Sequence, residues 1–162
     1  MRAIGALPLA LLLLLTPAAC RTEPQGKAAA AKAESGLELI PVEIRSGGKV
    51  HRFSAEVART PEEQATGLMY RESLGPDRAM LFPYSPPEVA SFWMKNMLIP
   101  LDMIFIREDG SIARIADNTI PQSLEPVTAG EPVAAVLEIA GGRSAELGIT
   151  DSDTVSWTGG PK

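Results

Sequence analysis

The chain has 162 residues, of which 45% are apolar and 22% are charged, and this composition excludes a wholly disordered or collagen-like chain. Lys and Arg total 15 against 20 Asp and Glu, and an acidic chain of net charge −5 without a basic block is a poor candidate for binding nucleic acid. One cysteine and one histidine exclude a disulfide framework and a zinc site built from Cys and His.

The first segment has the pattern of a secretory signal. Arg2 is the only charged residue before the apolar run Leu9–Leu15, and small residues follow the run before Cys20. The run is too short to cross a bilayer core of about 30 Å, which needs about 20 apolar residues. We therefore expect residues 1–19 to be a signal peptide that is removed on export.

Cys20 follows Ala18 and Ala19 at the end of the apolar run. This arrangement resembles the lipobox of bacterial lipoproteins, in which the cysteine is acylated and becomes the new N-terminus. Pro17 departs from the lipobox, so ordinary signal-peptidase cleavage near Ala19 is the alternative. Because Arg21 rather than Asp follows the cysteine, the resemblance implies the outer membrane. We predict a periplasm-facing outer-membrane lipoprotein, or a protein secreted to the periplasm if Cys20 is not acylated.

Residues 20–36 are expected to be the acylated N-terminus and a flexible tether. The segment 21–36 contains Pro and Gly but no large apolar residue, so it cannot contribute to a core. As a coil, a segment of this length spans roughly 20–24 Å. We expect residues 37–158 to form a single β-rich domain and residues 159–162 to be a disordered tail.

The domain begins with two runs of strand pattern, Leu37–Ile44 and Val50–Val57, on either side of a Gly-Gly turn, and this predicts a hairpin. Pro41 lacks an N–H group, so we expect the first run to be an edge or bulged strand. The segment Thr60–Met69 is predicted to be a helix, because Thr60 suits an N-cap and a proline follows it at the first helical position.

Short strands and one further helix follow in the rest of the chain. The residues Ile104, Phe105 and Ile106 are consecutive and apolar, so we expect their strand to be covered on both faces. The pattern predicts a mostly β fold, a single pseudo-barrel of short, bent antiparallel strands with two short helices. The strands are expected at Met80–Phe82, Ser91–Met94, Leu101–Arg107, Ser111–Ala116, Val133–Ile139 and Thr154–Trp157, and the second helix at Arg143–Leu147.

Three motifs point to a family: GLMYR at residues 67–71, FWMKN at 92–96 and IPLD at 99–102. In this order they resemble the uncharacterised prokaryotic family catalogued as domain of unknown function 192, and the resemblance covers Val42 to Trp157. It implies a mostly β pseudo-barrel domain, often behind a signal peptide, in a family without an established activity.

Several polar residues gather near these motifs. An apolar pocket on which polar groups converge is typical of a small-ligand site, with Arg71 and Lys95 receiving an anionic group beside Trp93. The alternative is a polar network that fixes the loops, because a buried carboxylate such as Asp102 must be paired. The predicted cleft consists of Arg71, Trp93, Lys95, Asn96, Asp102 and Glu138.

Two other function classes stay open. Asp102 and Glu138 are weak catalytic candidates, as acid and base of a hydrolase on an envelope polymer, although nothing in the sequence brings them together. Met94 and Met97 beside Trp93 are weak candidates for a Cu(I) site, because thioethers bind this ion, but methionines also fill irregular cores.

The preferred interpretation is a binding or interaction module, with an enzyme less favoured and no cofactor expected. We expect a monomer that meets the membrane through its lipid anchor and does not bind nucleic acid. Its predicted partner is a small anionic ligand or an envelope protein.

Overall fold

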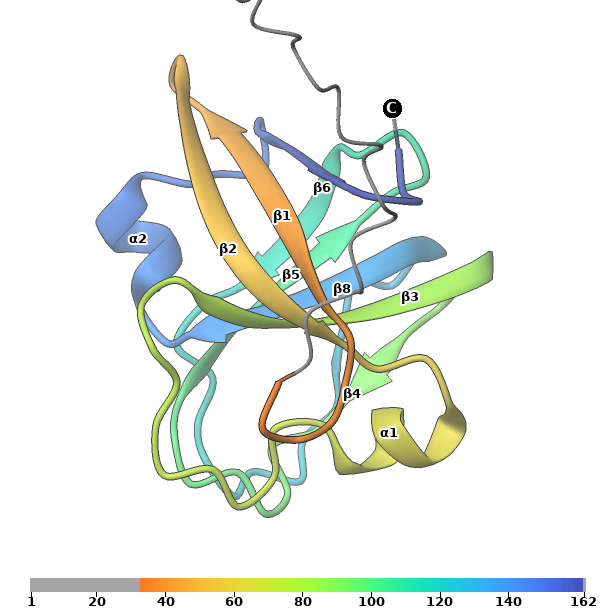
Figure 1. Cartoon of the computed structure of the whole chain (residues 1–162), viewed down its shortest axis with the longest axis vertical. Coiled ribbons are helices and arrows are strands. Elements are labelled where there is room, and N and C mark those ends of the chain that lie inside the picture. The colour runs from red at the N-terminus through yellow and green to blue at the C-terminus, as the bar shows by residue number, and fades with distance from the viewer. Residues whose placement is uncertain (1–32, 162) are drawn as a thin grey trace, which may run out of the picture.

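The computed structural model describes residues 33–161 of the chain (Figure 1). The predicted signal peptide, Cys20 and residues 20–32 of the predicted tether lie outside the described residues. Within residues 33–161, none of the helices is long and apolar enough to cross a membrane.

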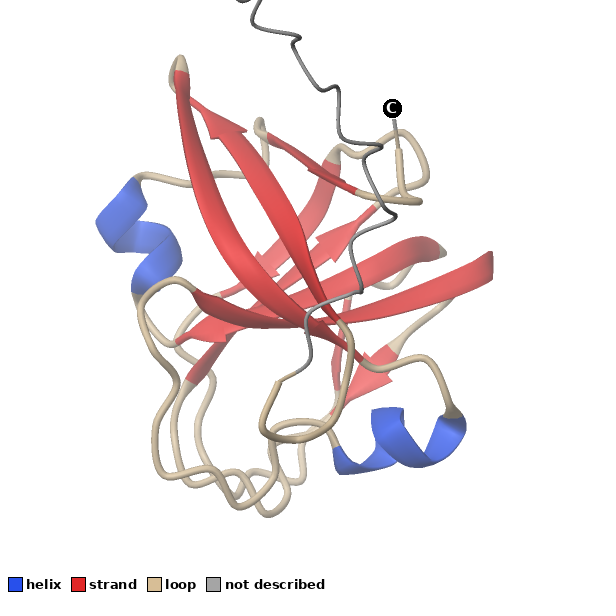
Figure 2. Ribbon diagram, viewed as in Figure 1, coloured by secondary structure: helices blue, strands red, loops and turns tan. Residues whose placement is uncertain are grey.

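Strands dominate the part of the chain that is described (Figure 2). Seven of them form one sheet in the order β6-β5-β8-β3-β2-β1-β9, and β4 pairs with β7 separately. The strands of the large sheet are β1 (Leu39–Ser46), β2 (Lys49–Val57), β3 (Arg78–Glu88), β5 (Leu101–Ile106), β6 (Ile112–Ala116), β8 (Val133–Ala140) and β9 (Thr154–Trp157). The other elements are β4 (Ser91–Phe92), β7 (Val127–Thr128), α1 (Pro61–Thr66) and α2 (Arg143–Leu147).

The large sheet curls until its two edges approach each other. Figure 1 shows β1 and β2 crossing the direction of β3 and β8. The edges meet where Ser111, just before β6, forms a bridge with Thr154 of β9, and where the amide of Val155 donates to the carbonyl of Gly110 at 2.8 Å. The predicted mostly β fold with two short helices is thereby confirmed, as a curled half-barrel.

One strand pair departs from the antiparallel arrangement that we predicted. β2 and β3 are parallel, with Glu56 beside Met80. A parallel neighbour requires a crossover connection, and the segment containing α1 provides it. This crossover places α1 beside the end of β3 that carries the site described below.

The predicted hairpin forms, with β1 and β2 paired from Leu39–Glu56 to Ser46–Lys49 around Gly47 and Gly48. The expectation that β1 lies at a sheet edge is wrong, because β9 pairs with its other side. β9 pairs only with Val42 to Arg45, so Pro41 stands just outside this ladder and no bond to β9 is lost through its missing N–H.

Helix α1 begins as predicted and ends earlier. The side chain of Thr60 accepts a hydrogen bond from the Glu63 amide at 3.2 Å, and the Glu63 carboxylate accepts one from the Thr60 amide at 2.9 Å. This capping box satisfies two amides that the helix leaves unpaired. The helix stops at Thr66 instead of Met69, because Gly67 has a φ of 49°.

Apolar side chains form two cores, one on each face of the sheet. The first lies inside the curled sheet and the second on the outer face of β3, β8 and β5, under α1 and the loops. Strand β5 contributes Ile104 and Ile106 to the first core and Met103 and Phe105 to the second. All six of its residues are buried, which confirms that it is covered on both faces.

Candidate functional site

A row of side chains crosses the outer face of the sheet from β2 to β5. Glu56 pairs with Met80, Met80 with Glu138 and Glu138 with Met103, and residues opposite each other in neighbouring strands share a face. Two carboxyl groups therefore stand on the face of the second core. Glu56 and Glu138 are two strands apart, about 10 Å between backbones.

Glu138 is the most unusual group in this row. Its side chain is completely buried, and neither carboxyl oxygen has a hydrogen-bond partner among residues 33–161. Burial raises the pKa of Glu138 from 4.5 to about 8, because the low-dielectric surroundings disfavour its charged form. At neutral pH the group is therefore mostly an uncharged acid that can donate one hydrogen bond and accept others.

Glu138 lines a cavity of about 350 Å³ between α1, the end of β3 and the segment 89–97. The tryptophan predicted as a site residue, Trp93, lies at this cavity with 47% of its surface exposed. The lining is aromatic, acidic and thioether in character. The residues that give it this character are Phe82, Tyr84, Phe92, Trp93, Glu88, Glu138, Met69 and Met97.

The aromatic rings are held by one another. The rings of Phe82 and Phe92 meet edge to face with centroids 5.0 Å apart, and Phe92 meets Phe105 in the same way at 6.3 Å. The pKa of Tyr84 is raised, mainly by burial and further by the charges of Glu88 and Glu138. Tyr84 therefore stays protonated beside the acidic side chains.

A cation already lies on one of these rings. The Nζ atom of Lys95 is 5.0 Å from the centroid of the Trp93 ring, which is the geometry of a cation–π contact. Lys95 is exposed and is not among the residues that line the cavity.

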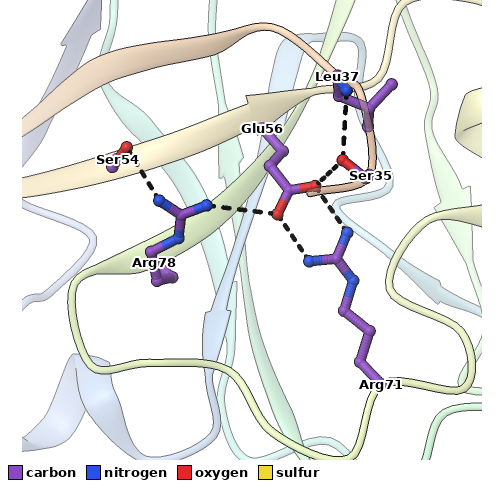
Figure 3. A network of polar contacts seen from close by, with 6 residues as sticks. All are labelled: Ser35, Leu37, Ser54, Glu56, Arg71 and Arg78. Atoms are coloured by element: carbon purple, nitrogen blue, oxygen red, sulfur yellow. Dashed lines mark hydrogen bonds and ion pairs between the residues drawn. The ribbon is translucent and has the colours of Figure 1, made fainter. Parts of the chain in front are cut away.

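Arg71 takes part in a different arrangement, around Glu56 (Figure 3). Its guanidinium donates to both Glu56 oxygens at 2.6 and 2.7 Å, while Ser35 donates to one of them at 2.6 Å. Arg78 lies 3.6 Å from the same carboxylate. These donors, Arg71 first, hold the pKa of Glu56 below its usual value. The charge of Arg71 is thus balanced inside the protein, in a depression of about 810 Å³ separate from the cavity.

Asp102 serves the backbone. Its carboxylate accepts hydrogen bonds from the amides of Asn118 at 2.7 Å, Gly142 at 2.8 Å and Ser144 at 2.7 Å. It joins the segment after β6 to the start of α2. Asp102 pairs with Ile139, whereas Met103 pairs with Glu138, so the two carboxyl groups point to opposite faces of the sheet. A hydrolase that uses them as a pair has no geometric support.

The remaining candidate residues, Asn96, Met94 and Met97, stabilise a loop or pack against neighbouring side chains. Asn96 has a φ of 61°, and its carbonyl accepts from the Tyr70 amide at 2.9 Å. The buried sulfur of Met94 accepts a hydrogen bond from Thr119 at 3.1 Å, whereas Met97 lines the cavity. Within the described residues, no group of three or more His, Cys, Asp and Glu could hold a metal ion.

The structure thus divides the predicted cleft. Trp93 and Glu138 share one cavity, Lys95 adjoins it through the Trp93 ring, and Arg71 and Asp102 belong to two other places. The cavity lining within residues 33–161 includes two acidic side chains, Glu88 and Glu138, and no Lys, Arg or His. Glu56, Tyr84 and Glu88 were not identified as site residues from the sequence. Glu56 alternates with apolar residues along its strand, and this pattern does not show that other segments cover the sheet face on which Glu56 lies.

Comparison with known proteins gives a family but no activity. The family model DUF192, described as "Uncharacterized ACR, COG1430", matches residues 42–157. A crystal structure of a protein of unknown function from Novosphingobium aromaticivorans is 45% identical, with a TM-score of 0.77 over 81% of this chain and 94% of that one. A Sinorhizobium meliloti protein, provisionally described as a transcription regulator, is 36% identical, with a TM-score of 0.74 over 76% and 96%. No curated protein matches the chain.

Proposed function

The chain belongs to the DUF192 family, and from that premise we propose that it is a binding module whose ligand site is the cavity between Trp93 and Glu138. The observation that carries the proposal is the Glu138 carboxyl group, which is buried without a hydrogen-bond partner among residues 33–161 while it lines a cavity. A buried polar group without a partner costs about 1–3 kcal/mol. A ligand that hydrogen-bonds or pairs with this carboxyl group offsets that cost, so the pairing contributes to the binding free energy.

The lining is suited to a small ligand. Aromatic rings provide apolar contact, and a few polar groups at one place provide orientation, which is the composition of small-molecule sites. Phe92 is fixed by two edge-to-face contacts, so much of the wall exists before a ligand arrives. Met69 and Met97 are flexible thioether side chains that can move to admit a ligand toward the buried carboxyl group.

We propose that this module acts outside the cytoplasm, held to the outer membrane by acyl chains on Cys20. The support is the pattern of residues 1–20, in which a short apolar run ends at small residues and a cysteine. The body of the protein is acidic, so an anionic membrane surface does not attract it, and the acyl chains would have to hold it there.

Three matched probes test the site: choline, its uncharged isostere 3,3-dimethylbutan-1-ol and the anion 3,3-dimethylbutanoate. Binding is followed by fluorescence in a Trp157→Phe background, in which Trp93 is the only tryptophan. We expect at least one probe to change the Trp93 emission with saturation.

A filled cavity provides the control. Ala65 lines the cavity from α1, whereas Ala145 is an exposed alanine on α2, so Ala65→Phe is expected to abolish the fluorescence change and Ala145→Phe to leave it intact. The proposed site is wrong if none of the three probes binds, or if Ala65→Phe binds as the parent does.

A further inference from the structure

We propose, building on the binding function above, that the cavity receives an alkylammonium group, with its positive charge toward Glu138 and its carbon atoms against the aromatic rings. The class of ligand follows from three features of the cavity. These are the sign of its charged residues, the kind of rings in its wall and the buried Glu138 carboxyl group, which has no hydrogen-bond partner among residues 33–161.

The charged residues of the cavity are all acidic. Its lining within residues 33–161 includes Glu88 and Glu138 and contains no Lys, Arg or His. The guanidinium group of Arg71 is paired with the Glu56 carboxylate, to which it donates two hydrogen bonds. Among the lining residues that the structure describes, an anionic group would therefore meet acidic side chains and no cation, because Lys95 lies outside the lining. An ammonium group would meet the Glu88 carboxylate and the carboxyl group of Glu138, which can ionise beside it.

The wall of the cavity is the kind that binds ammonium groups. The faces of aromatic rings attract cations, and a desolvated contact contributes about 2 kcal/mol or more. Phe82, Tyr84, Phe92 and Trp93 all line the cavity. The protein itself shows the interaction, because the ammonium group of Lys95 lies 5.0 Å from the Trp93 ring centroid.

The carboxyl group provides the counter-charge and loses a proton. When the cavity is empty, Glu138 keeps its proton at neutral pH, since burial raises its pKa to about 8. A cation beside it favours the ionised form, so binding transfers this proton to solvent. Among residues 33–161, the other titratable groups that line its cavity are Tyr84 and Glu88 of β3, and Tyr84 stays protonated throughout.

The experiment compares choline with 3,3-dimethylbutan-1-ol, which has the same shape without the charge. In the Trp157→Phe background at pH 8, we expect choline to bind at least tenfold more tightly than the alcohol, and 3,3-dimethylbutanoate to bind weakest. In Glu138→Gln the preference for choline is expected to fall by roughly threefold or more, and the part that the aromatic rings and Glu88 provide is expected to remain. Asp102→Asn on the opposite face is not a suitable control because it disturbs the fold, so Asp117→Asn, an exposed carboxylate after β6, serves instead.

The pH dependence gives a second, independent readout. Choline itself does not titrate between pH 7 and 9, so its affinity is expected to rise about tenfold over this range as Glu138 ionises more readily. Calorimetry in two buffers of different ionisation enthalpy should show a proton released at pH 7. Glu138→Gln should show neither effect.

The outcomes separate the two proposals. If the alcohol or the anion binds the cavity as tightly as choline, the ammonium proposal is wrong and the binding module stands. If none of the probes binds, both are wrong. Vesicles of phosphatidylcholine then identify the source of the group: Glu138-dependent binding to vesicles indicates a lipid headgroup, and binding of free choline alone indicates a soluble ligand.

Discussion

Glu138 and Asp102 are buried carboxyl groups on neighbouring strands, and their surroundings differ completely. Asp102 receives three backbone amides, while Glu138 has no partner within residues 33–161. A carboxylate that accepts several hydrogen bonds stabilises the structure around it, whereas an unpaired one destabilises it. This contrast separates the architectural group from the candidate ligand-binding group, although both face apolar cores.

Replacing Glu138 by Gln is predicted to remove a pH-dependent loss of stability. The unfolded chain loses this proton near pH 4.5 and the folded protein near pH 8, so between these values the unfolded state binds fewer protons and stability falls as pH rises. The accumulated loss is about 4 kcal/mol by pH 8. Urea unfolding should show Glu138→Gln and wild type to be similar at pH 4, and the variant more stable by a few kcal/mol at pH 8.

The control for this measurement is Glu88→Gln, since Glu88 is exposed and lines the same cavity. The free energy of unfolding of Glu88→Gln should fall with rising pH as steeply as that of the wild-type protein. If the free energy of unfolding of Glu138→Gln had the same pH dependence as that of wild type, the raised pKa of Glu138 would be contradicted.

Asp102→Asn is predicted to destabilise the protein by about 2–3 kcal/mol. One carboxylate oxygen accepts from Asn118 and Gly142 and the other from Ser144, so an amide places an NH₂ group against at least one amide donor. Urea unfolding at pH 7 measures the change. Asp117→Asn, at an exposed position, should stay within about 0.5 kcal/mol of wild type, and a similarly small effect at Asp102 would show that these bonds contribute little.

At the scale of elements, the Glu56–Arg71 pair joins β2 to the segment that follows α1. Glu56 has 3% of its side chain exposed and Arg71 has 27%, so solvent screens their interaction only in part. The crossover segment between β2 and β3 is thereby held against the sheet, and the same segment contains α1, which covers the cavity. The crossover segment thus carries both an ion pair to β2 and, in α1, part of the cavity wall.

Arg71→Ala is predicted to cost about 2 kcal/mol near neutral pH, because Glu56 then stays buried with weaker partners. The pKa of Glu56 is lowered mainly by Arg71, so the stability from the pair is present above the unfolded pKa near 4.5 and is lost as pH falls. Chemical unfolding should therefore show the stabilities of the variant and the wild type to converge as the pH falls below 4.5.

Arg52→Ala removes an exposed arginine from its pair with Glu43 and is the matched control. Its cost should remain below about 1 kcal/mol at every pH. If Arg71→Ala were no more costly, the pair would be only a surface contact.

At the scale of the whole molecule, the proposed anchor and the proposed cavity are separate functions of one chain. The cavity lies in the domain, and Cys20 lies outside the described residues. The domain's ligand binding is therefore expected to be independent of acylation.

Cys20→Ser is predicted to abolish labelling by radioactive palmitate and to move the protein from the membrane fraction to the periplasmic fraction. The thiol of Cys20 is the only one in the chain, so no other cysteine can accept the acyl group. A wild-type protein that remains unlabelled would show that Cys20 is not acylated and would overturn the proposed anchor. Probe binding by the purified variant should equal that of the wild type.

The amino-acid sequence by itself determined the local structure and the family. Period-two alternation and a Gly-Gly turn predicted the hairpin, Thr60 and Pro61 predicted the start of α1, and the motifs between residues 67 and 102 predicted the family. The hairpin, the start of the helix and the family motifs each depend on residues that are close together in the sequence, so the sequence alone is enough to predict them.

Only the tertiary structure decided what surrounds each polar side chain. Sequence patterns placed Glu138 and Trp93 among the candidate cleft residues, but they did not show that Tyr84 lies at the same cavity, which it reaches from another segment. The partners of Asp102 lie 16 to 42 residues away along the chain. Strand periodicity tells which residues share a face, and the free energy of a buried charge depends on what covers that face, which distant segments provide.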